Sequence, residues 1–217
     1  MRPSKQQTMA KFTLGVLFFI LLNFHSFSWW SVNGTDRGFD GENIIQNYIV
    51  HGAGYFLDSY ANTLLFMKKT ELSGCQGTSY EELGKLLDNA LESMKMAIET
   101  YTNLKQAADH TPYNPIVIDA LKSYNYTSLQ ETSGLDAAVF SVVKMYLVNG
   151  DIRGVYGKML SDTNKILSLL TTVKASIDEG RFPELTDVWN LNQAFSRTLL
   201  FGQYVAQVFN DLLKNNL

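Results

Sequence analysis

The sequence predicts an all-α protein, an elongated up-and-down bundle of four long helices with one or two short ones added. Apolar residues recur at the three- and four-residue spacing of helices along most of the chain. No segment alternates with the period of two that a half-buried strand shows, and the β-branched run 116–118 is too short and isolated to found a sheet. Helices of roughly 25 to 33 residues would be about 38 to 50 Å long, which favours packing side by side.

The first 28 residues have the layout of a secretory signal. Basic residues precede the apolar run 12–22, and Ser26 and Ser28 stand at the minus-three and minus-one positions of a cleavage site. This predominantly apolar run of 11 residues is short for a spanning helix. We therefore expect cleavage, export to a periplasmic or extracellular space, and a soluble product with no stable membrane insertion.

After this signal peptide (1–28), the sequence predicts a flexible arm over 29–41 and one helical-bundle domain over 42–217. The strongest helix lies between Ser79 and Asp109, where Ser79 and Glu82 have the spacing of a capping box. Pro112 and Pro115 mark its end. Its apolar seam is spaced alternately by four and three residues and comprises Leu83, Leu87, Ala90, Met94, Ala97, Tyr101, Leu104 and Ala108.

The other helices are predicted from weaker patterns. A first helix spans about 42–72, with a break or kink near Gly52 and Gly54, because two glycines in three residues lower the helical preference. Short helices are expected near 115–124 and 133–148, and long ones over about 151–178 and 183–215. The predicted buried face of the last helix is Val188, Phe195, Leu199, Gly202, Ala206, Phe209 and Leu213.

Charge argues against a nucleic acid partner. Removal of the leader takes three basic and no acidic residues with it, which leaves 15 Lys and Arg against 21 Asp and Glu, a net charge of −6. Such a surface repels phosphates and anionic lipid headgroups.

Few residues offer reactive chemistry. His51 and His110 remain after cleavage, and neither follows a Glu at minus three or pairs with a second histidine, so we expect no metal and no cofactor. Cys75 is the only cysteine and lies in a small flexible loop, so it is a free thiol or an intermolecular bridge, and a homodimer is possible. An enzyme that uses Cys75 or His51 in a cleft between helices is one alternative.

The loops on either side of the short helix 115–124 carry the residues most typical of recognition. Tyrosine and asparagine there resemble adaptable binding loops in composition, although tyrosines that cap a bundle are often structural. We predict a ligand-binding site made of His110, Tyr113, Tyr124, Asn125 and Tyr126.

The functional hypothesis is a non-enzymatic exported bundle that binds an unknown protein or small-molecule ligand through this loop end. Two alternatives stay open. One is the cleft enzyme. The other is a sensory ectodomain tethered to the membrane by an uncleaved leader.

Overall fold

A computed structural model describes residues 40–73, 79–110, 113, 115–133 and 136–214 of the 217-residue chain. All regular structure in these ranges is helical, which confirms the predicted all-α fold. The four long helices are α2 (Asp40–Ser73), α3 (Tyr80–His110), α7 (Ile152–Asp178) and α8 (Leu185–Lys214). The three short helices are α4 (Pro115–Ser123), α5 (Tyr126–Ser133) and α6 (Ala137–Leu147).

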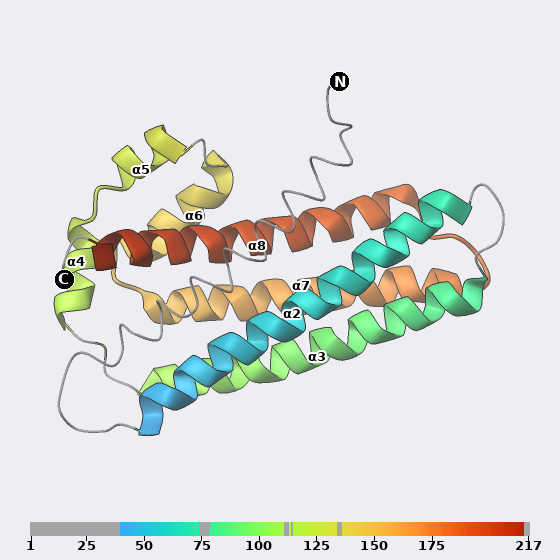
Figure 1. Cartoon of the computed structure of the whole chain (residues 1–217), viewed down its shortest axis with the longest axis horizontal. Helices are drawn as coiled ribbons and strands as arrows, with labels where there is room; N and C mark the ends of the chain where they lie inside the picture. Colours follow the sequence, from blue (N-terminus) through green and yellow to red (C-terminus); the bar gives the residue numbers. More distant parts are fainter. Residues whose placement is uncertain (1–39, 74–78, 111–112, 114, 134–135, 215–217) are drawn as a thin grey trace.

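The long helices alternate in direction along the bundle (Figure 1). α2 and α3 form an antiparallel hairpin, α7 packs against α3, and α8 packs against α7. The three short helices lie at one end, between the end of α3 and the start of α7, and α6 packs against both α7 and α8. The opposite end holds the α7–α8 connection, next to the end of α2 and the start of α3 (Figure 1).

α3 supplies the centre of the core. Every residue of its predicted apolar seam is at most 2% exposed, because α2 covers one side of the helix and α7 covers another. The backbone N–H of Glu82 donates to Ser79 Oγ at 3.2 Å, as an N-cap requires. The helix ends at His110, two residues before Pro112, as predicted.

α8 closes the bundle onto α2 through aromatic rings. Phe195 lies edge-on to Phe56, with ring centroids 5.5 Å apart, and stacks on Tyr60 at 4.9 Å. A polar contact joins α2 to α3 in the same region, because Ser59 Oγ donates to the carbonyl of Ala90 at 2.7 Å. The buried hydroxyl is thus satisfied within the core.

Of the break or kink predicted in the first helix, the break is wrong. α2 runs without interruption through Gly52 and Gly54. Gly52 faces the ring of Tyr101 so closely that an added Cβ would lie 2.5 Å from its Cε1, whereas Gly54 has open space around it. The first glycine therefore allows close approach of α3 and does not interrupt the helix.

The buried face of α8 is not the predicted one. The residues that are buried lie about one position away in sequence from those that were predicted to be buried. Phe195 and Phe209 are buried as predicted, but Leu199, Gly202 and Ala206 are only partly covered. Leu199, Leu200 and Phe201 are consecutive apolar residues, so two overlapping stripes fit the sequence and packing decides between them. The residues that α8 buries are Leu191, Phe195, Thr198, Phe201, Tyr204, Val205, Val208, Phe209 and Leu212.

The region after α4 contains one helix more than predicted. Residues 126–133 form α5, where a loop was expected, and the predicted helix 133–148 is α6 alone. Side-chain N-caps explain why α5 and α6 begin where they do. Asn125 Oδ1 accepts from the N–H of Ser128, and Asp136 Oδ1 accepts from the N–H groups of Ala138 and Val139.

The two glycines of α2 give a matched pair of stability tests. We expect Gly52→Ala to lower the free energy of unfolding by about 1 kcal/mol, because overpacking costs about 1–3 kcal/mol and the better helix propensity returns about 1. Gly54→Ala should raise it by about 0.5–1 kcal/mol, since nothing obstructs the methyl group. Urea denaturation measures both, and equal effects would contradict the close approach at Tyr101.

Candidate functional site

The residues of the predicted ligand site surround α4 at one end of the bundle, but they do not form one cluster. His110 is the exposed last residue of α3, and Tyr113 follows it half-buried. Tyr124 and Tyr126 lie after α4, with their rings edge to face at a centroid separation of 5.0 Å. Asn125 lies between them, with its side chain used as the cap of α5.

Both tyrosines after α4 make structural hydrogen bonds. Tyr126 is 3% exposed and its hydroxyl donates to the carbonyl of Leu121 at 2.8 Å. The Tyr124 hydroxyl donates to Asp211 Oδ2 on α8, also at 2.8 Å. Burial raises the pKa of both phenols, and the bond to Asp211 raises the pKa of Tyr124 further. In this conformation Tyr126 has almost no surface to offer a ligand, and a ligand-binding role for the group stays a prediction.

Tyr113 belongs to a different contact. The guanidinium carbon of Arg153, on α7, lies 5.5 Å from the centre of its ring, a cation–π arrangement. Arg153 Nε also donates to the carbonyl of Ala108 at 3.0 Å, so this side chain holds the start of α7 against the end of α3. Burial raises the pKa of Tyr113 to about 12, although the charge of Arg153 lowers it in part.

Chain geometry separates Cys75 from both histidines. Cys75 lies outside the described residues, but Ser73, two positions before it, ends α2. His51 lies 22 residues earlier on the same helix, about 33 Å away, and two residues span at most about 7 Å. His110 lies 30 residues beyond Tyr80 on α3, about 45 Å away, and five residues span at most about 18 Å. A pair of Cys75 with His51 or with His110 therefore cannot form within the chain.

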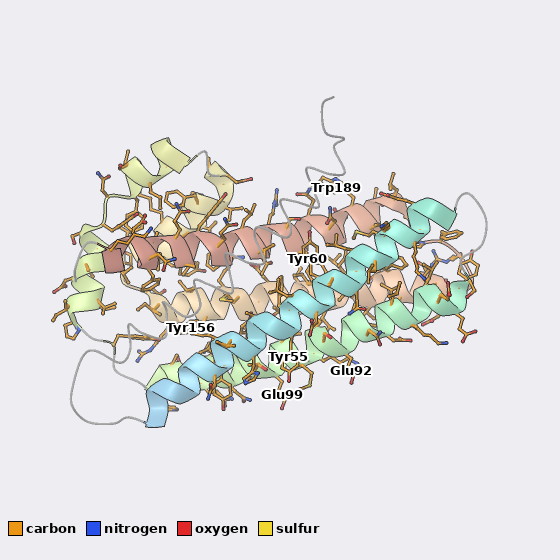
Figure 2. All side chains as sticks on the ribbon, viewed as in Figure 1. Tyr55, Tyr60, Glu92, Glu99, Tyr156 and Trp189 are labelled. Atoms are coloured by element: carbon orange, nitrogen blue, oxygen red, sulfur yellow. The ribbon has the colours of Figure 1, made fainter. Side chains whose placement is uncertain are left out.

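Acidic side chains are spread over the surface. Glu92 and Glu99 project outward from α3 (Figure 2), and Asp88 pairs with Lys174 of α7 at 3.1 Å. Among the residues that the structure describes, no three of His, Cys, Asp and Glu come together as a metal ion would require. None of the described helices is both long and apolar enough to span a membrane.

The most unusual surface lies at the other end of the bundle, around the α7–α8 connection. Four large apolar side chains are exposed there: Tyr80 at 39%, Phe182 at 50%, Leu185 at 84% and Trp189 at 59%. We call these four residues the exposed apolar patch. The rings of Tyr80 and Phe182 lie 5.2 Å apart, and Leu185 and Trp189 are one turn apart on α8. Figure 2 shows Trp189 at the outer edge of the bundle.

The turn after α7 places Phe182 on this surface. Gly180 has a φ of +69°, which suits glycine, and its N–H donates to the carbonyl of Ile177 at 3.0 Å. The N–H of Arg181 donates to the carbonyl of Ser176 at 3.1 Å. These two bonds form a Schellman cap, which ends α7 and turns the chain toward α8. The sequence signal was the Gly180 that follows the last apolar residue of the helix.

Comparison with known proteins gives no relative: no family model, no curated protein and no solved structure matches this chain.

The hydrogen bond of Tyr126 predicts a stability effect. We expect Tyr126→Phe to lower the free energy of unfolding by about 1–2 kcal/mol, because the buried carbonyl of Leu121 loses its donor. Tyr80→Phe is the control, since its ring is exposed, and it should change stability by less than about 0.5 kcal/mol. Thermal or urea unfolding measures both, and a neutral Tyr126→Phe would show that the bond does not hold the α4–α5 link.

Proposed function

We propose that this chain is a non-enzymatic exported binding protein that captures a protein partner through the exposed apolar patch. The observations that carry the proposal are the exposure of Tyr80, Phe182, Leu185 and Trp189 and the contact between the rings of Tyr80 and Phe182. Single exposed apolar residues are ordinary on protein surfaces, but clustered ones mark interaction sites. Tryptophan, tyrosine and phenylalanine are also the residue types enriched at the centres of interfaces.

The exposure of the patch favours a protein partner over a small molecule. Small-ligand sites enclose most of the ligand surface, whereas Leu185 is 84% exposed and Trp189 59% exposed. The separation of Cys75 from His51 and His110 disfavours a cysteine nucleophile activated by either histidine, which is one form of the enzyme alternative. Binding through apolar surface requires no such pair.

Export is supported by the signal-like first 28 residues. Mass spectrometry of the protein recovered from an expressing cell should give an N-terminus near Trp29. An intact leader in the membrane fraction would instead favour the tethered ectodomain.

A random peptide library displayed on phage tests the patch as a binding surface. Peptides selected on the full chain should lose binding at least about tenfold to Trp189→Ala or Leu185→Ser, because these variants remove the anchoring contacts. They should bind Tyr124→Ala normally, since Tyr124 lies at the opposite end of the bundle. Peptides that depend on Tyr124 and ignore Trp189 would contradict the proposal and support the loop site. Circular dichroism checks that each variant is folded.

A further inference from the structure

We propose that Asn125 is an acceptor site for N-linked glycosylation. This modification goes beyond the proposed binding function and rests only on its export, because glycans are attached to asparagine in chains that enter the secretory pathway. Two observations carry the proposal: the acceptor sequence formed by residues 125–127, and the position of the Asn125 side chain at the start of α5.

The acceptor sequence is Asn-X-Ser or Asn-X-Thr, in which X is any residue except proline. It occurs twice in the chain, at Asn33 and at Asn125. Asn33 lies outside the described residues. Asn125, Tyr126 and Thr127 lie where the chain passes from α4 into α5. Every other asparagine in the chain lacks serine or threonine two positions later.

The two residues that define the acceptor sequence both face solvent. Asn125 and Thr127 are exposed, whereas Tyr126 between them is 3% exposed and donates its hydroxyl hydrogen bond to the carbonyl of Leu121. The variable middle position is therefore the one that packs into the core. A glycan is bulky and hydrophilic, so a folded protein can carry it only on a side chain at the surface. Asn125 meets that condition.

The two polar atoms of the Asn125 amide group have separate roles. Its Oδ1 accepts from the N–H of Ser128 at 3.1 Å and caps α5. Its Nδ2 donates no hydrogen bond within the part of the chain that the structure describes. Three other asparagines use Nδ2 to bond the carbonyl four residues earlier, namely Asn62, Asn149 and Asn164. A glycan is attached to Nδ2, so its addition at position 125 leaves the cap in place.

The transfer step is a substitution at the sugar. The donor is an oligosaccharide linked to a lipid through a diphosphate group. Nδ2 of Asn125 forms a bond to the anomeric carbon of the terminal sugar, and the bond between that carbon and the diphosphate oxygen breaks. Nδ2 loses one proton, and the lipid diphosphate leaves with the electron pair. No group is oxidised or reduced.

A glycan at this position affects the two ends of the bundle differently. Tyr124 and Tyr126 are its neighbours in sequence, so the sugar covers part of the surface that composition favoured for ligand binding. The exposed apolar patch lies around the α7–α8 connection, at the opposite end of the long helices (Figure 1). The modification therefore leaves the patch open to a partner.

Expression of the full chain in a cultured eukaryotic cell tests the acceptor site. The recovered Asn33→Gln variant should still migrate faster after treatment with peptide-N-glycosidase F, which removes N-linked glycans and converts the asparagine to aspartate. Adding Asn125→Asp should abolish this shift, because the carboxylate has no nitrogen to modify. Aspartate also caps helices well, so this variant keeps the start of α5. Peptide mass spectrometry should place the glycan on Asn125.

Two substitutions at Thr127 provide a matched control with the asparagine unchanged. Thr127→Ala should abolish the glycan, and Thr127→Ser should retain it. Both should leave the circular dichroism spectrum unchanged, since Thr127 is exposed. A glycan that persists in Thr127→Ala would overturn the proposal. So would a secreted chain in which Asn125 is unmodified.

The N-terminus of the recovered protein separates this proposal from export. A secreted chain that begins near Trp29 and has no glycan at Asn125 shows that the acceptor site is wrong and that export stands. A chain that keeps its leader, remains in the cytosol and has no glycan contradicts both. A chain that keeps its leader in the membrane fraction and carries the glycan supports the acceptor site and the tethered ectodomain together.

Discussion

The bundle depends on the apolar seam of α3, which two long helices cover at once. Small residues alternate with large ones along this seam, as in Ala90, Met94 and Ala97. The alanines allow backbones to come close, so that Ser59 of α2 reaches the carbonyl of Ala90. Each fully buried leucine or methionine contributes about 1.5–3 kcal/mol by leaving water. α8 is added to this two-sided core by packing against α7.

The contrast between apolar buried positions and polar exposed positions explains which helices could be predicted. On α3 the exposed positions are mostly polar, so the apolar seam stood out and all of its predicted residues are buried, although Gly84 and Thr100 are buried as well. On α8 the run from Leu199 to Phe201 allows two faces, and only packing against α6 and α7 selects one. α5 has a weaker pattern, with Tyr126 and Leu129 as its buried residues, so its helical character depends on the Asn125 cap and on tertiary contacts.

The candidate site was harder to predict, because residue type does not reveal exposure. Tyrosine suits both a binding loop and a core with a polar rim, and Tyr126 belongs to the core. Leu185 and Trp189 are apolar residues at the start of a helix, which are normally assigned to its buried face. Leu185 lies six positions before the buried Leu191, and Trp189 lies six positions before the buried Phe195. Six positions correspond to about 240° round the helix axis, so both residues point away from the buried face. Their exposure could be predicted only once the buried face of α8 was known.

Both ends of the bundle expose large apolar side chains, with Ile116, Met145 and Val148 at the α4–α6 end, but the exposed aromatic rings of the described residues lie at the α7–α8 end. At the α4–α6 end, polar groups are joined across elements, as when the N–H of Asp136 donates to the Tyr204 hydroxyl at 2.9 Å. At the α7–α8 end, large apolar side chains remain in water although the helices below them have a complete core. Apolar surface in water carries a free-energy cost of about 25 cal/mol per Å², and nothing in the packing of the bundle requires Leu185 or Trp189 to bear it. Under the proposed function, a partner that covers this surface removes that cost.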